Sequence, residues 1–140
     1  MPYATQADLI DRFGETELAQ RTNRVDGLTI DVVVLGRALA DADAEIDSYL
    51  ATRYALPLAT VPAVLVRLGA DLARYRLYDD GVPETVRLRY QDAVSLLKRM
   101  ASGEVRVAGS TVLPVATGGG QAVAVMTPER VFSAALLAGY

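Results

Sequence analysis

The 140-residue chain has no cysteine, no histidine, no tryptophan and a single lysine, Lys98. Because cysteine is absent, disulfides, thiolate nucleophiles and zinc sites of the cysteine type are excluded. Because histidine is absent, the Ser-His-Asp triad and the HExxH zinc helix are excluded as well. The chain therefore also lacks the side chain that most readily transfers protons near neutral pH. Carboxylates, tyrosine, arginine and Lys98 are what remains for catalysis.

The chain also lacks an excess of positive charge and any long apolar run. Its 14 basic and 17 acidic residues give a net charge of -3, which argues against a broad DNA-binding surface because non-specific affinity for DNA comes from neutralising phosphates. No run of about 18 apolar residues is present, so no membrane span is predicted. The N-terminal residues do not follow the pattern of a targeting signal. We expect a soluble protein made in a cytoplasm.

Charge is distributed unevenly along the chain, and this divides it into two regions. Only four charged residues follow position 102, namely Glu104, Arg106, Glu129 and Arg130. Residues 1–102 are predicted to form a helical bundle domain, and residues 103–140 a low-charge C-terminal extension or docking arm. A chain of this length can bury enough surface for one stable core without a disulfide or a metal.

Apolar residues at steps of three and four predict helices over residues 5–14, 15–21, 31–54, 63–78 and 83–102. Thr5 begins the first helix, where Asp8 completes a capping-box pattern. Asp31 is the predicted N-cap of the third and longest helix, which we expect to continue to about Tyr54 because Pro57 disfavours helix just before it. The short connection between the last two helices predicts an antiparallel hairpin.

After Gly103 the pattern changes to alternation of apolar and small or polar residues. Val105 and Val107 on one side, and Val123 and Val125 on the other, predict a small ribbon around the glycine loop at 118–120; that loop lacks the GK[ST] sequence of a phosphate-binding loop. The predicted fold class is therefore all-α: a bundle of about four to five helices with a long central helix, plus an extended or small β-ribbon C-terminal extension.

Acidic residues cluster on the long helix, where Asp43 and Asp47 share one face and Asp41 and Glu45 another. Carboxylates at this spacing can chelate a hard cation, but a solvated or subunit-facing surface is the favoured interpretation. We predict an acidic interface face that contains Asp41, Asp43 and Asp47.

Arginine and tyrosine are frequent on the fourth helix, and both are enriched at interface hot spots. The contact spacing of Arg67, Asp71 and Arg74 also suits a structural network, and neither interpretation is preferred. The low charge and apolar anchors of the C-terminal segment are typical of a segment that orders on binding. The predicted interface residues are Arg74, Tyr75, Tyr78, Arg130, Phe132 and Tyr140.

Several sequence segments together resemble the Mu-type phage and prophage neck-protein family. They are YATQADLI at 3–10, RFG at 12–14, ALADA at 38–42, IDSYL at 46–50, RYALPL at 53–58, DLARYRLYD at 71–79 and RVF at 130–132. The resemblance covers nearly the whole chain and is most specific up to residue 78.

The resemblance implies a head-tail connector, or adaptor, in the virion neck of a tailed phage or prophage. Such a protein forms a ring, of twelve copies by expectation, that contacts the phage portal protein and a downstream neck or tail-completion protein. The predicted interface residues would then contact a neighbouring subunit, the portal or the tail. The acidic face that contains Asp41, Asp43 and Asp47 would line the channel of the ring or a subunit interface. DNA passes through this ring without specific binding, and the protein has no catalytic activity and no cofactor. Assembly would take place in the cytoplasm of the bacterial host.

Two other classes of protein remain open. The first is a small monomeric helical binding module or regulator encoded by a phage. The second is an enzyme that uses carboxylates, which predicts a buried pocket holding at least two acids with raised pKa values.

Overall fold

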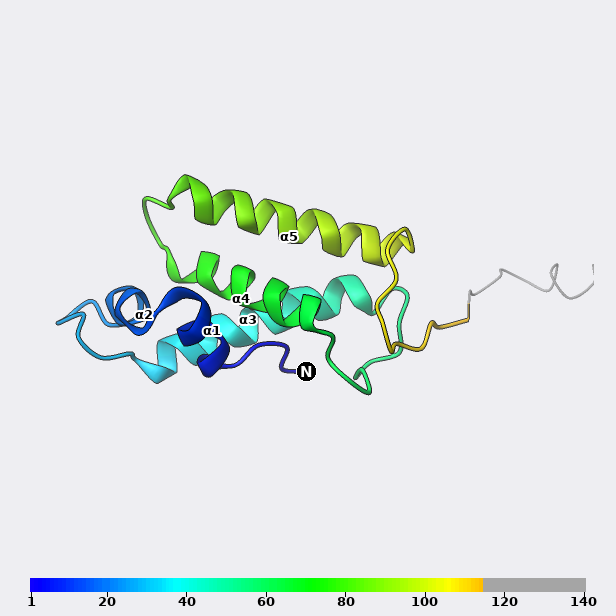
Figure 1. The fold of residues 1–140 in the computed structure, drawn as a ribbon, viewed down its shortest axis with the longest axis horizontal. Helices are drawn as coiled ribbons and strands as arrows, with labels where there is room; N and C mark the ends of the chain where they lie inside the picture. Colours follow the sequence, from blue (N-terminus) through cyan, green and yellow to red (C-terminus); the bar gives the residue numbers. More distant parts are fainter. Residues whose placement is uncertain (115–140) are drawn as a thin grey trace, which may run out of the picture.

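The computed structural model describes residues 1–114, and within them it has five helices and no strand (Figure 1). The predictions made for the glycine loop at 118–120, for Val123 and Val125, and for Arg130, Phe132 and Tyr140 lie outside the described residues. The helices are α1 (Gln6–Phe13), α2 (Glu15–Thr22), α3 (Val32–Leu50), α4 (Ala63–Leu77) and α5 (Glu84–Ser102). The all-α prediction is confirmed.

Local capping signals fix where the helices begin and end. At the start of α1, the Thr5 side chain accepts a hydrogen bond from the Asp8 amide while the Asp8 carboxylate accepts one from the Thr5 amide, so the predicted capping box is formed. The Asp31 carboxylate accepts hydrogen bonds from the amides of Val33 and Val34 and caps α3.

The prediction that the long helix continues to about Tyr54 was wrong, because α3 ends at Leu50. Residues 51–53 form a turn, and Tyr54 forms an isolated antiparallel bridge with Val112. The Tyr54 side chain is only 1% exposed and its hydroxyl accepts a hydrogen bond from the Val107 amide. Burial of this ring and pairing with the distant segment therefore outweigh the helix propensity of residues 51–53.

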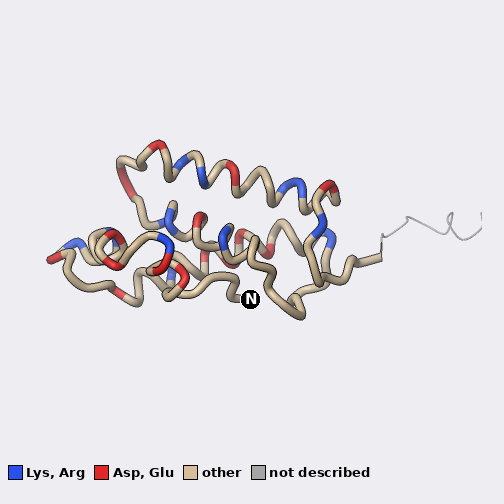
Figure 2. The backbone as a smooth tube through the Cα atoms, in the orientation of Figure 1, with Lys and Arg blue, Asp and Glu red and all other residues tan. Residues whose placement is uncertain are grey.

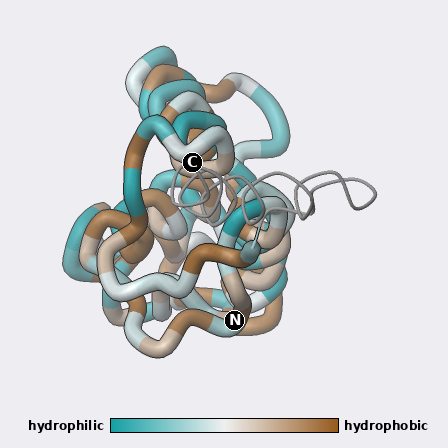
Figure 3. Tube along the Cα trace, turned by 90° about the vertical axis from the view of Figure 1, so that its right-hand side faces the viewer, coloured by the Kyte–Doolittle hydropathy of each residue, from teal (hydrophilic) through white to brown (hydrophobic). Residues whose placement is uncertain are grey.

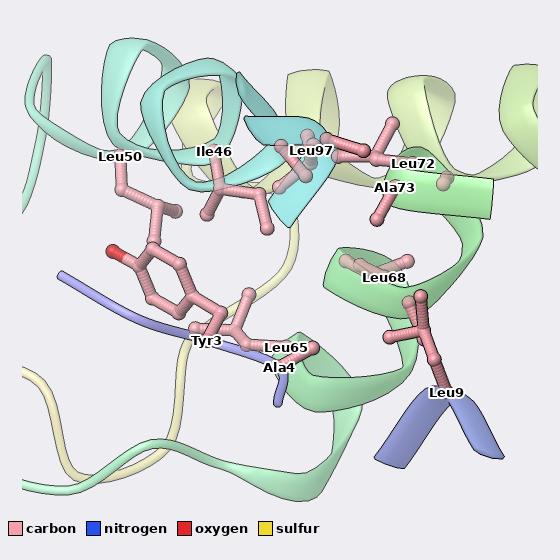
Figure 4. Close-up of a cluster of buried hydrophobic side chains, with 14 of the residues drawn as sticks. Tyr3, Ala4, Leu9, Ile46, Leu50, Leu65, Leu68, Leu72, Ala73 and Leu97 are labelled. Carbon is pink, nitrogen blue, oxygen red and sulfur yellow. The ribbon is translucent and has the colours of Figure 1, made fainter. Parts of the chain in front are cut away.

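Helix α4 occupies the centre of the bundle, where it contacts α1, α3 and α5, while α2 packs against α1 and α3. In Figure 1, α5 covers one side of α4 and the short helices α1 and α2 lie on the opposite side. The core is a cluster of leucines and other apolar side chains from all five helices, joined by the N-terminal segment (Figure 4), and its members include Tyr3, Leu9, Ile46, Leu50, Leu65, Leu68, Leu72 and Leu97.

The segment after α5 packs on the bundle and does not form the first strand of a ribbon, so that part of the prediction was wrong. Its backbone pairs with the turn after α3: the Ala55 amide donates to the Thr111 carbonyl at 2.9 Å, and the Leu113 amide donates to the Arg53 carbonyl at 2.7 Å. Val107 is 3% exposed and belongs to the core.

Gly103 begins this segment in the left-handed region, with φ of 86°. A Cβ atom at this position would lie 2.5 Å from the Cζ atom of Arg53. Glycine fits the left-handed backbone conformation at this position, and an added Cβ atom would also displace the guanidinium at the flexible end of the Arg53 side chain.

Candidate functional site

Arg74 is one of the predicted interface residues, and its guanidinium contacts the protein's own helices. It donates two hydrogen bonds to the Glu17 carboxylate, from Nε at 2.8 Å and from Nη2 at 2.7 Å. The guanidinium carbon also lies 4.3 Å from the centroid of the Phe13 ring. The hydrogen bonds to Glu17 raise the pKa of Arg74. This bidentate ion pair joins α2 to α4. The sequence spacing suggested that both Arg67 and Arg74 contact Asp71. In the described residues Arg67 forms this ion pair, at 3.7 Å, and Arg74 pairs with Glu17 instead.

The two tyrosines of the predicted interface also lie against neighbouring helices. The ring of Tyr75 stacks on that of Tyr90 of α5, with centroids 4.0 Å apart. The guanidinium of Arg21 lies over the Tyr78 ring, 4.6 Å from its centroid. Tyr75 and Tyr78 are half-buried, so each keeps part of its surface for a partner; their role in an interface stays a prediction.

The acidic residues of α3 do not form one surface, because two of them hold the N-terminal segment. The Tyr3 amide donates to Asp43 at 2.9 Å, the Tyr3 hydroxyl donates to Asp47, and the terminal ammonium of Met1 lies 3.4 Å from Asp47. Burial is the main reason that the pKa values of Asp43 and Tyr3 are raised, and the hydrogen bond to Asp47 raises that of Tyr3 further. Of the three predicted residues, Asp41 is exposed.

Asp41 lines a shallow hollow of about 520 Å³ near the α2–α3 connection, together with Arg37, Arg76 and Asp31. Glu45, which the sequence placed on the same helix face as Asp41, is bonded inside the molecule. It accepts hydrogen bonds from Arg76 at 2.7 Å and from the Tyr90 hydroxyl at 3.0 Å. Acidic and basic residues are interspersed over the helices (Figure 2), so the surface around Asp41 carries both signs of charge.

A second carboxylate with a raised pKa, Asp71, lies in a groove formed by α1, α4 and α5. Asp71 is 5% exposed, and burial raises its pKa although four arginines lower it. The groove has a volume of about 430 Å³ and is lined by Arg12, Phe13, Arg67, Asp71, Arg89 and Asp92. Asp43, the other acid with a raised pKa, does not line this groove. Among residues 1–114 no group of three or more acidic side chains is placed to hold a metal ion.

Sequence reasoning missed an apolar surface at the α2–α3 connection, which projects at the left end of the body in Figure 1. Its large apolar side chains are highly exposed: Val25 by 97%, Leu28 by 78%, Val33 by 65% and Val32 by 61%. We call these four residues the apolar tip. Large apolar residues between Asn23, Asp26 and Gly27, with no helical period, were the signal in the sequence that could have revealed it.

The loop that carries the apolar tip is held by its own polar side chains. The side-chain Oδ1 atom of Asn23 accepts from the Val25 amide at 3.1 Å, and the Asp26 carboxylate accepts from the Leu28 amide at 2.9 Å. The Thr22 hydroxyl accepts from the Asp31 amide at 2.9 Å. Because these bonds fix the backbone, the exposed apolar side chains are presented in an ordered loop, which lowers the entropy cost of binding.

A pocket of about 530 Å³ lies at the other end of the body, which Figure 3 views directly. Its walls come from the turn after α3 and the segment after α5, and we call it the end pocket. The residues that line it are Tyr54, Arg106, Val107, Ala108, Gly109, Ser110 and Val112. Within the described residues, no helix is long and apolar enough to cross a membrane.

Residues 3–125 match the model of the protein family described as Bacteriophage Mu, Gp36. The chain belongs to the Mu Gp36 family. The match covers all five helices and the segment that packs after α5. Family membership confirms the resemblance to Mu-like phage proteins and indicates a phage structural or morphogenesis protein.

Two curated relatives of the Mu Gp36 family are similar to this chain. Gene product J of Escherichia phage Mu is 35% identical over 135 residues, which are 95% of each protein. The Mu-like prophage FluMu protein gp36 of Haemophilus influenzae is 39% identical over 103 residues, which are 74% of this chain and 73% of the relative. The similarity to the phage Mu protein therefore extends over nearly the full length of both.

Proposed function

We propose that this Mu Gp36 family member is a head-tail connector that forms a ring below the portal of a tailed phage and joins the capsid to the tail. The observation that carries the proposal is the full-length similarity to a phage Mu protein, together with an ordered helical body that exposes large apolar side chains at one end. Exposed apolar surface of this kind is typical of protein interaction sites.

The packing of the described residues suits a body that transmits force between partners. Arg74 ties α2 to α4, Arg76 ties α4 to α3, and the N-terminal segment is bonded to α3 through Asp43 and Asp47. Each contact joins elements that are distant in sequence. A ring of identical copies needs a body that keeps its shape, because each copy must present the same two surfaces to its neighbours.

The proposed role includes passage of DNA through the ring without specific binding and without catalysis or a cofactor. With a net charge of -3, the chain offers little basic surface to hold the phosphates. Of the acidic residues predicted for the channel, Asp41 remains the candidate because Asp43 and Asp47 are bonded to the N-terminal segment. An assembled ring in which Asp41 faces neither the channel nor a subunit would reject this assignment.

Reconstitution with portal protein tests the proposal. We expect the full-length chain to add to portal rings as a closed ring, and a chain lacking residues 130–140 to keep its helical circular dichroism but not to add. Failure of the intact chain to bind competent portal rings favours the alternative, a helical binding module. A large loss of helix in the shortened chain means that residues 130–140 belong to the core.

A further inference from the structure

The apolar tip and the end pocket lie at opposite ends of the described body. The α2–α3 connection, which carries the tip, is at one end, and the turn after α3 and the segment after α5, which line the pocket, are at the other (Figure 1). The 19 residues of α3 run between these two ends. At a rise of 1.5 Å per residue, this helix alone separates them by roughly 28 Å. One molecule therefore cannot bring its own tip to its own end pocket without unfolding.

The end pocket has a mixed lining, and its apolar part suits an apolar side chain. Tyr54 and Val107 line it and are buried, with exposed fractions of 1% and 3%, while Val112, which also lines it, is 42% exposed. A volume of about 530 Å³ falls in the range of clefts that hold small ligands, which is about 300–1,000 Å³. The side chains of Val25 and Leu28 match it in chemistry, since both are apolar and presented by an ordered loop.

The charges beside the two features are also complementary. Asp26 lies between Val25 and Leu28 on the tip and is exposed, while Arg106 lines the end pocket and is exposed. Neither forms an ion pair with another residue in the described part of the chain. Attraction between Asp26 of one copy and Arg106 of another would favour one orientation of the tip in the pocket over others.

We propose that the apolar tip of one copy inserts into the end pocket of a second copy, with Asp26 of the tip facing Arg106 of the pocket. This contact is heterologous, because it joins two different surfaces of the same chain. Repeated contacts of this kind close into a ring when the rotation between neighbours permits. The inference rests on the proposed function only for ring closure; the tip-to-pocket contact between two copies is tested separately.

Cysteine cross-linking provides the test, because the natural chain has no cysteine. Full-length Leu28→Cys chains are mixed with full-length Val112→Cys chains under mild oxidation, both free at high concentration and bound to portal rings. Leu88→Cys is the matched control, because Leu88 is 45% exposed on α5, outside both features. We expect at least about tenfold more disulfide dimer from Leu28 with Val112 than from Leu28 with Leu88, since the contact raises the local concentration of the thiols.

A charge-reversal series tests orientation in the same assay. Asp26→Arg on the Leu28→Cys chain should reduce the mixed dimer, and Arg106→Glu on the Val112→Cys chain should restore it. Equal yields with the Leu88 control in both the free and the portal-bound state overturn the proposal. So does preferential pairing of Leu28→Cys with itself, which would indicate a two-fold contact.

Three further outcomes separate this proposal from the alternative occupant of the pocket and from the proposed connector role. A chain with both Val112→Cys and Phe132→Cys that forms only an internal disulfide would show that the chain's own C-terminal segment fills the pocket, which overturns the contact between copies. If cross-linking fails while the chain still adds to portal rings, the tip-to-pocket contact is wrong and the connector role stands. If cross-linking succeeds without addition to portal rings, the contact stands and the connector role fails.

Discussion

Removing one hydroxyl group from the N-terminal segment should measurably weaken the fold. The Tyr3 hydroxyl donates to the Asp47 carboxylate, while the ring is buried in the core at 3% exposure. Tyr3→Phe keeps the ring and the backbone bond to Asp43, so it removes this one hydrogen bond. The terminal ammonium of Met1 remains beside Asp47.

The size of the effect follows from the charge and exposure of the acceptor. A hydrogen bond to a charged group contributes about 1.5–3 kcal/mol to stability. The Asp47 side chain is 32% exposed, so water compensates part of the loss, and we expect a decrease of about 1–2 kcal/mol in the free energy of unfolding. For a domain of this size, each 1 kcal/mol corresponds to a decrease in Tm of about 4 °C.

Urea unfolding followed by circular dichroism at pH 7 measures the difference, with Tyr49→Phe as the matched control. Tyr49 is half-buried against the core on α3, whereas Tyr3 is buried, and the Tyr49 hydroxyl forms no hydrogen bond with another residue of the described part. We expect this control to change the free energy of unfolding by less than about 0.5 kcal/mol. If Tyr3→Phe costs no more than Tyr49→Phe, the N-terminal segment does not depend on the bond to Asp47.

Three further substitutions are checked by the same unfolding measurement. Gly103→Ala should cost about 1–3 kcal/mol because alanine is strained in the left-handed backbone conformation of this position. Gly36→Ala, where a Cβ atom meets no atom within 4 Å, should be neutral or stabilising by up to about 1 kcal/mol. Equal effects of the two substitutions would contradict the account of Gly103. Arg74→Met should lower the free energy of unfolding by about 1–3 kcal/mol, because it removes both hydrogen bonds to Glu17. A double-mutant cycle with Glu17→Gln should give a coupling energy of at least about 0.5 kcal/mol. A coupling energy of zero would contradict the ion pair. Burial raises the pKa of Asp71, so the ionised carboxylate destabilises the folded state at pH values above the ordinary carboxyl pKa. Asp71→Asn should therefore increase the free energy of unfolding at pH 7, and this increase should disappear as the pH falls through the carboxyl range. An increase that does not depend on pH would contradict this explanation.

The parts of the fold that depend on neighbouring residues in sequence could be predicted. The capping box at Thr5 and Asp8 and the N-cap at Asp31 involve partners within three positions, so the sequence pattern is sufficient. The end of α5 at Gly103 follows from the left-handed conformation that glycine allows.

The parts that depend on distant contacts could not be predicted. Helix α3 ends before Tyr54 because that ring packs against Val107, which is more than 50 positions away. The hydrogen bond from the Tyr3 amide to Asp43 was missed for the same reason, because the two residues are 40 positions apart in the sequence. The same reason applies to the end pocket, which exists only when the two segments around Tyr54 and Val112 are brought together.

Electron cryo-microscopy of portal rings mixed with the full-length chain tests the connector role most directly. The account predicts a closed ring of this chain on the tail-facing side of the portal, with helical bodies around an open channel and each copy contacting the next through unlike surfaces. Portal rings without added density, or with isolated copies that do not touch one another, would contradict it.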